Sequence, residues 1–234
     1  MRICILGNSQ IGALKLGWEK IRARHPGVEI TFFGGPGDTM KHFAVQDGAL
    51  VAGTDRLREN LRTTAGSDRL DPGAYDVFVV AGYNQGHEPY LDRRLSASVR
   101  ALTLADRFAT SGGTELARRL RSLTDAPIVL IGAPLRKEGG TSTPTATANY
   151  LPVELEPAIE AEAAQAGFAW LGQPRETVTA DGFWTRAAYS QGAIRLADER
   201  GGGTEADARR EDMVHKNADF GALVITTLLD RLVA

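Results

Sequence analysis

Residues 2–10 read RICILGNSQ, and this stretch decides how the rest of the chain is interpreted. A short apolar run rich in β-branched residues that ends at a glycine is typical of a buried parallel strand. The apolar residues that follow are spaced by three or four, which predicts an amphipathic helix over 11–21. Ser9 therefore lies between a predicted strand and the start of a helix, near helix-terminal N–H groups that can stabilise an anion. A serine in this place can also simply cap the helix.

The alternation of strand and helix continues along the chain. Further strands are predicted at 28–33, 76–81, 127–131 and 168–171, and further helices at 91–123 with a break at 111–113, at 153–166, and from Asn217 onwards. This order predicts an α/β protein, a three-layer α/β/α sandwich around a mainly parallel five-stranded sheet. Residues 38–72 are less regular, with a short strand at 49–52 and a short helix at 55–62. With no repeat and no linker, we interpret 1–234 as a single domain.

Two other segments carry polar residues at the edge where parallel strands end. Gly82-Tyr83-Asn84 follows the strand at 76–81, so the Asn84 amide can donate to a developing oxyanion, although turn asparagines are common. Asp212 precedes His215 by three residues, just before the last helix. Such a histidine can act as general base toward a serine while the carboxylate orients its ring. By itself the pair can equally be a structural hydrogen bond in a loop.

Taken together, the order of these segments resembles the SGNH/GDSL hydrolase family. The resemblance implies a flavodoxin-like sheet, Ser9 as nucleophile and oxyanion donor, Asn84 as a further donor, and His215 with Asp212 as base and orienting acid. It also implies a glycine donor after the second strand. Gly37-Asp38-Thr39 looks like that family's glycine block, so Gly37 is favoured, with Gly34 and Gly35 left open.

The nucleophile block departs from the family pattern at two positions. Asn8 stands where the family usually has aspartate, and Gln10 where leucine is common. Because that aspartate is not the triad acid, we expect the chemistry to survive the change. The variant suggests a divergent subfamily, and we treat Asn8 and Gln10 as candidate substrate contacts.

Other residues are weaker candidates for binding substrate. His87 follows Asn84 by three positions and is expected near the same edge, although a surface histidine is the simpler interpretation. Trp184 and Tyr189, with Phe183, lie in a loop-rich region before the Asp212–His215 pair. Their rings suit an acyl or aromatic pocket, or equally the packing of a long loop.

Composition excludes several classes of function. The 27 basic and 29 acidic residues give a net charge of −2, and no basic patch indicates a nucleic-acid partner. No apolar run is long enough to predict membrane insertion, and no signal peptide is visible, so we expect a cytoplasmic protein. We expect no cofactor and no metal, because neither Gly-x-Gly-x-x-Gly, nor a Gly-Lys-Ser/Thr loop, nor a metal-ligand cluster is present.

The sequence therefore predicts a serine esterase or acyl hydrolase that cleaves a small-molecule carboxylic ester through an acyl-serine intermediate. An O-acyltransferase or deacylase acting on a saccharide or another acyl ester would use the same residues. A binding module that keeps the fold without catalysis is a third possibility, and a flavin- or nucleotide-binding protein a fourth. Turnover of short esters separates the catalytic interpretations from the last two.

Overall fold

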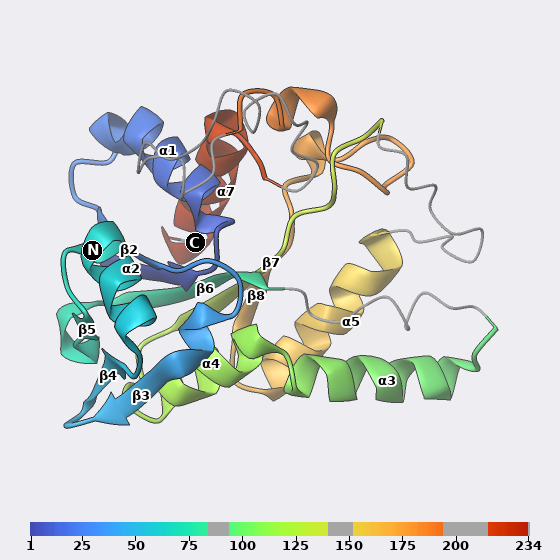
Figure 1. Ribbon diagram of the computed structural model, residues 1–234. Coiled ribbons are helices and arrows are strands. Elements are labelled where there is room, and N and C mark those ends of the chain that lie inside the picture. The colour runs from blue at the N-terminus through green and yellow to red at the C-terminus, as the bar shows by residue number, and fades with distance from the viewer. Residues whose placement is uncertain (84–93, 140–151, 194–214, 234) are drawn as a thin grey trace.

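The computed structural model describes residues 1–83, 94–139, 152–193 and 215–233. At its centre is a five-stranded sheet in which every pair of neighbouring strands is parallel (Figure 1). In spatial order the strands are β2 (Glu29–Gly34), β1 (Arg2–Gly7), β6 (Val77–Tyr83), β7 (Ile128–Gly132) and β8 (Ala169–Leu171). The predicted parallel five-stranded sheet is confirmed.

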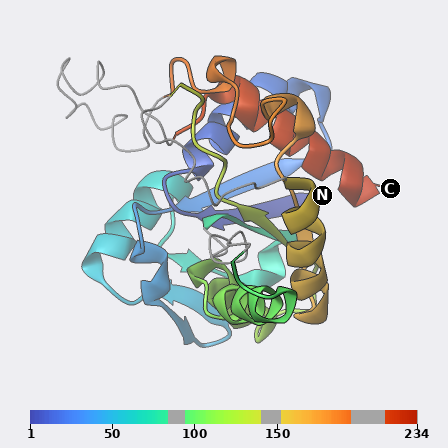
Figure 2. The same ribbon diagram turned by 90° about the vertical axis from the view of Figure 1, so that its right-hand side faces the viewer.

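Helices cover both faces of this sheet (Figure 2). One face packs against α1 (Ile11–Ile21) and α7 (Ala218–Val233). The other carries α2 (Asp55–Ala65), α3 (Ala97–Ala109), α4 (Gly112–Arg121) and α5 (Pro152–Gln165). Alternate residues of β1 supply the two cores, because side chains along a strand point to opposite faces. Ile3 and Ile5 pack toward α1 and α7, whereas Cys4 and Leu6 pack on the opposite side. The three-layer sandwich is therefore confirmed.

Helices α1 and α7 approach each other at backbone distance. A Cβ placed on Gly17 would overlap the backbone of Gly221 and Ala222, and one on Gly221 would overlap the carbonyl group of Ala13. Glycine is needed at both positions, since any side chain would push the two helices apart. This contact joins the helix that follows Ser9 to the helix that follows His215, and so brings the two ends of the chain together.

A second sheet, which the sequence pattern does not predict, lies beside α2. It is antiparallel and consists of β3 (Phe43–Gln46), β4 (Ala49–Ala52) and β5 (Arg69–Leu70). Asp47 and Gly48 connect β3 to β4 and both have positive φ, at 49° and 70°. Two such residues form the turn that matches the twist of a β-hairpin, and Asp-Gly is a preferred pair for it. The short strand predicted at 49–52 is β4, and the helix predicted at 55–62 extends to Ala65.

Element boundaries elsewhere follow the pattern with small shifts. The helical region 91–123 is two helices separated at Ser111, whose hydroxyl accepts a hydrogen bond from Thr114 N–H, and the part before residue 94 lies outside the described residues. Short 3₁₀ turns occupy Arg22–Arg24, Thr39–His42, Pro72–Ala74, Arg175–Thr177 and Ala187–Tyr189. In the part of the chain that the structure describes, no helix is both long and apolar enough to cross a bilayer.

Candidate active site

The side chains of Ser9 and His215 meet at the carboxyl edge of the sheet. His215 Nε2 lies 2.9 Å from Ser9 Oγ, across 206 positions of sequence, and both side chains are partly buried. A serine hydroxyl within hydrogen-bond reach of an imidazole is the arrangement that general-base activation requires. Ser9 follows β1 directly, and His215 precedes α7, so the contact between α1 and α7 determines this distance.

Asn8 holds the Ser9 turn against the neighbouring strand. Its Nδ2 donates to the Gly82 carbonyl at 2.6 Å, and its Oδ1 accepts from the Gln10 N–H at 3.0 Å. A Cβ on Gly82 would lie 2.4 Å from Asn8 Oδ1, so the two loops fit together only with glycine there. Asn8 is a candidate substrate contact in the sequence; in the structure, backbone groups engage both of its polar atoms, an arrangement that suits a residue that positions Ser9.

Asn217 holds the segment that carries His215. Its Oδ1 accepts from the N–H groups of Asp219 and Phe220, each at 3.1 Å, which caps α7. Its Nδ2 donates to the Ala188 and Gln191 carbonyls at 2.7 and 3.0 Å. One side chain therefore ties the start of α7 to the loop around residue 190, two residues from the imidazole.

In the turn after β2, the amides of Gly34 and Gly35 donate to other groups, whereas the Gly37 amide makes no hydrogen bond within the described part of the chain. Gly34 N–H donates to Thr64 Oγ1 at 3.1 Å, and Gly35 N–H donates to the Gly7 carbonyl at 3.2 Å. Gly37 is exposed, adopts a φ of 55°, and has nothing within 4 Å of where a Cβ would lie. Among the three glycines left open by the sequence, these bonds favour Gly37 as the free donor.

The same turn approaches the end of β6. Burial raises the pKa of the Tyr83 hydroxyl, and the negative charge of Asp38 raises it further, so this side chain stays a neutral phenol. Gly113 leaves room for the Tyr83 ring, since a Cβ there would lie 3.0 Å from Tyr83 Cβ. The loops after β1, β2 and β6 thus converge near Ser9.

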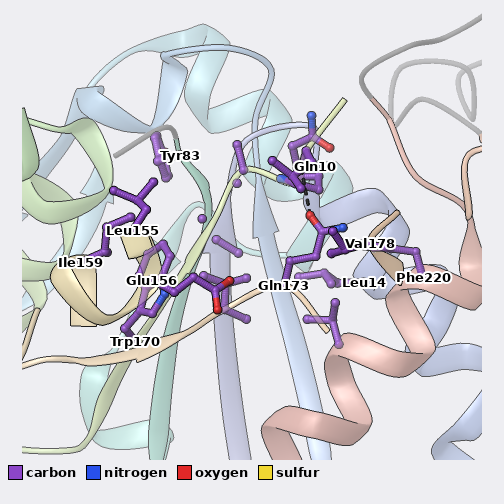
Figure 3. Close-up of a pocket in the computed structure, with 18 residues that line it drawn as sticks. Gln10, Leu14, Tyr83, Leu155, Glu156, Ile159, Trp170, Gln173, Val178 and Phe220 are labelled. Atoms are coloured by element: carbon purple, nitrogen blue, oxygen red, sulfur yellow. Dashed lines mark hydrogen bonds between the residues drawn. The ribbon is translucent and has the colours of Figure 1, made fainter. Parts of the chain in front are cut away.

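A cavity of about 80 Å³ lies over the ends of β6, β7 and β8, and Gln10, the residue after Ser9, is part of its lining. Figure 3 shows Tyr83, Leu155, Ile159 and Trp170 on one side of it, and Leu14, Val178 and Phe220 on the other. Gln10, Gly82, Glu156 and Gln173 complete the polar part of its lining. Of the candidate substrate contacts, Gln10 lies in this cavity.

Glu156 and Gln173, two polar residues of the cavity wall, differ in their hydrogen bonds within the protein. Gln173 is fully engaged, because its Oε1 accepts from Leu135 N–H at 2.9 Å and its Nε2 donates to Thr177 and Thr185 at 2.9 and 3.1 Å. Burial raises the pKa of the Glu156 carboxyl, which outweighs the opposing effects of the Arg175 charge and of a hydrogen bond from the Gln173 backbone. Gln173 is therefore part of the cavity's frame, whereas Glu156 is a titratable group in its wall.

Two predicted substrate contacts are not part of this cavity. Trp184 is fixed in a turn by backbone hydrogen bonds to Thr179, and Tyr189 lines a surface groove beside α1 and α7. Their place in the sequence suggested a pocket, but the loop that carries them packs against the Gln173 region and α7 instead. Trp170 and Glu156 line the cavity, and no local pattern in the sequence indicated them, because they lie on β8 and α5.

Three of the predicted residues lie outside the described ones, namely Asn84, His87 and Asp212. Among the residues with described positions, no group of three His, Cys, Asp or Glu side chains is placed to hold a metal ion.

The chain is similar to known proteins in its structure. No family model and no curated protein matches the chain. A lipopolysaccharide acetyltransferase periplasmic domain from Salmonella ser. Paratyphi A is 14% identical, with 100% of this chain and 84% of that chain covered at a TM-score of 0.47. A GDSL-like lipase from Bacteroides thetaiotaomicron VPI-5482 is 12% identical over 99% and 87% of the two chains, at a TM-score of 0.38.

A gut microbial diltiazem-metabolizing enzyme is 14% identical over 98% of this chain, at a TM-score of 0.45. This chain spans only 46% of that protein's length. With identities this low, the interpretation of the site depends on the contacts within this chain.

Proposed function

We propose that this protein is a serine hydrolase of the SGNH/GDSL type that cleaves a carboxylic ester. The observation that carries the proposal is the 2.9 Å contact between Ser9 Oγ and His215 Nε2. It is supported by the position of Ser9 after the first strand of a parallel sheet and of His215 before the last helix. The order of the motifs along the chain adds to this support.

The reaction proceeds in two halves. His215 Nε2 takes the hydroxyl proton as Ser9 Oγ attacks the ester carbonyl, and the tetrahedral intermediate collapses when His215 returns that proton to the leaving alcohol. A water molecule then attacks the acyl-serine, His215 accepts its proton, and the carboxylic acid leaves as Ser9 regains its hydrogen. Asp212 is the proposed partner of the second imidazole nitrogen.

The oxyanion is stabilised by hydrogen-bond donors near Ser9. We assign this role to the backbone N–H of Ser9, the N–H of Gly37 and the side-chain amide of Asn84. The engagement of Gly34 and Gly35 with other partners supports the choice of Gly37. Removing one such donor typically costs about 3 kcal/mol of transition-state stabilisation.

Hydrolysis of p-nitrophenyl acetate tests the proposal. Wild-type protein is expected to release p-nitrophenol in a burst followed by steady turnover, whereas Ser9→Ala shows neither. Ser67→Ala is the matched control, because the Ser67 hydroxyl makes a turn with the Arg69 backbone in another part of the molecule. Equal activity in wild type and Ser9→Ala would overturn the proposal.

An O-acyltransferase would use the same serine and histidine but pass the acyl group to an alcohol. Adding a sugar acceptor to the assay separates the two outcomes, since a hydrolase yields mainly free acid and a transferase mainly the new ester. The expected product is free acid. We also propose that the protein acts in the cytoplasm on a small-molecule substrate.

A further inference from the structure

The cavity at the strand ends contains a charged side chain. Glu156 is the only charged residue among the described residues that line it, and the others are apolar, aromatic or polar without charge. Figure 3 shows its carboxyl group reaching from α5 toward the middle of the cavity, between Trp170 and Gln173. A single carboxylate in an otherwise uncharged wall favours a positively charged group over a neutral or negative one.

A glycine leaves room for this carboxyl group. A Cβ added to Gly172 would lie 2.6 and 2.8 Å from the two carboxyl oxygens of Glu156. The φ of Gly172 is not positive, so the backbone conformation does not by itself require glycine there. A side chain at this position would instead displace the carboxyl group. The lack of one at Gly172 therefore allows Glu156 to extend into the cavity.

A second glycine leaves room for the ring of Trp170. A Cβ added to Gly132 would come within 2.7 Å of a carbon of that ring, and the φ of Gly132 is not positive either. Gly132 ends β7 and Gly172 directly follows β8, the neighbouring strand. Tyr83 and Phe220 add two further rings to the lining. Aromatic rings together with a carboxylate are surroundings in which proteins bind ammonium groups.

The charge of Glu156 is not neutralised by an ion pair within the described part of the chain. Arg175, whose positive charge lowers the pKa of this carboxyl, is exposed to solvent, and the Gln173 backbone N–H donates a hydrogen bond to it. Burial still raises the pKa of the Glu156 carboxyl above its ordinary value. A cation bound in the cavity would offset this cost of burying the ionised form.

We propose that this cavity is a cation site in which Glu156 binds an ammonium group of the substrate. Its volume of about 80 Å³ corresponds to roughly five water-sized spheres, which suits a trimethylammonium group. Gln10 links the cavity to the turn that carries Ser9, but Ser9 itself does not line it. The site therefore selects for charge at a distance from the ester bond. That the ammonium group belongs to an ester rests on the proposed function.

Binding of tetramethylammonium tests the site without the need for turnover. tert-Butanol is an uncharged probe of nearly the same shape. In isothermal titration calorimetry at about pH 8, where carboxyl groups are normally ionised, we expect the wild type to bind tetramethylammonium at least about 10-fold more tightly than tert-butanol. Glu156→Gln should remove this difference.

Two further variants locate the effect in the cavity. Gly172→Ala keeps the charge of Glu156 but displaces its carboxyl group, so it should reduce the preference for tetramethylammonium. Glu115→Gln makes the same chemical change as Glu156→Gln on the exposed surface of α4 and should retain the preference.

Two pairs of esters test whether the site selects the substrate. One pair is choline acetate and the acetate in which a tert-butyl group replaces the trimethylammonium group, so the charge lies on the alcohol. The other is the p-nitrophenyl ester of γ-trimethylammoniobutyrate and its tert-butyl analogue, with the charge on the acyl group. In one of these pairs we expect kcat/KM for the charged ester to exceed that for the neutral one by at least about 10-fold. This preference should persist in Glu115→Gln and disappear in Glu156→Gln.

The outcomes separate the cation site from the esterase activity. Equal binding of the two probes by the wild type, or a preference that is unchanged in Glu156→Gln, overturns the cation site. Ser9-dependent turnover with no charge preference in either pair overturns its role in selecting the substrate and leaves the esterase proposal intact. Glu156-dependent binding of tetramethylammonium with no Ser9-dependent turnover overturns the esterase proposal and leaves the cation site.

Discussion

The two faces of the central sheet are packed in different ways. On one face, α1 and α7 meet through Gly17 and Gly221, with their backbones in contact. On the other, α5 packs through Leu155 and Ile159, and these side chains line one side of the cavity at the strand ends, while Leu14 and Phe220 from α1 and α7 line the other side. Backbone contact leaves no freedom to adjust, whereas side-chain packing leaves space that can differ in size and polarity. We expect the backbone contact between α1 and α7 to set the distance between Ser9 and His215, and the side chains around the cavity to determine what fits there.

The strongest test of this contrast changes the backbone contact. Gly221→Ala adds one methyl group where it would overlap the Ala13 carbonyl, so α7 must shift and carry His215 away from Ser9. A displacement of about 1 Å at reacting groups can cost roughly 100-fold in rate, and we expect a loss of that order in kcat for p-nitrophenyl acetate.

Gly27→Ala is the matched control for this variant. A Cβ on Gly27 meets nothing within 4 Å, and its φ is not positive. It should retain wild-type kcat. If Gly221→Ala kept full activity as well, the role of the α1–α7 contact in setting the Ser9–His215 distance would be disproved.

A second change removes the bond that holds the nucleophile turn. Asn8→Ala leaves the Gly82 carbonyl and the Gln10 N–H without the partners they have now, which should lower the free energy of unfolding by about 1–3 kcal/mol. We expect kcat to fall about 10-fold, because Ser9 is less firmly placed. Chemical denaturation and ester hydrolysis measure the two effects, and an unchanged kcat would argue against a positioning role.

A third change acts on the segment that carries His215. Asn217→Ala removes the cap of α7 and both bonds to the loop around residue 190, so we expect a loss of about 1–2 kcal/mol in the free energy of unfolding. Asn217→Asp keeps the capping oxygen but loses the two donated bonds, so it should show an intermediate loss. Equal stability of Asn217→Ala and wild type would contradict this assignment.

The smallest effect concerns Glu156 on the cavity side and depends on pH. Its pKa is raised in the folded state, so the folded protein binds this proton more tightly than the unfolded chain does. The free energy of unfolding therefore decreases as pH rises above about 4.5, the ordinary value, through the raised pKa. Glu156→Gln lacks this titration and should gain stability relative to wild type over that range.

Thermal unfolding at a series of pH values measures this difference. The gap in Tm between Glu156→Gln and wild type should widen in favour of the variant as pH increases from 4 to 8. A gap that stays constant, or that widens at low pH instead, would show that burial does not raise this pKa.

Much of the fold followed from local patterns in the sequence. Each central strand is a short apolar run that ends near a glycine, and the last helix is predicted from Asn217 onwards. The β3–β4 hairpin does not follow from the apolar periodicity of residues 38–72, although the pair Asp47-Gly48 is typical of a hairpin turn. The Asp-Gly pair is a local pattern from which the hairpin can be predicted.

The cavity did not follow from the sequence, for a physical reason. Its wall combines Gln10, Trp170 and Phe220, which belong to elements far apart in the chain and meet only through the packing of the sheet and helices. Gly17 and Gly221 likewise appear in the sequence as residues that weaken helices, and only the packing of α1 against α7 explains them. The Ser9–His215 pair could be predicted from the sequence, because the loops that follow parallel strands lie at the same edge of the sheet.

The most direct test of the central claim is to react the protein with a fluorophosphonate probe and map the adduct by mass spectrometry. The account predicts a single adduct on the peptide containing Ser9, no adduct in Ser9→Ala, and labelling slowed at least about 100-fold in His215→Asn, because the serine is then no longer activated. Equal labelling of Ser9→Ala and wild type, or a modified residue elsewhere in the chain, would contradict it.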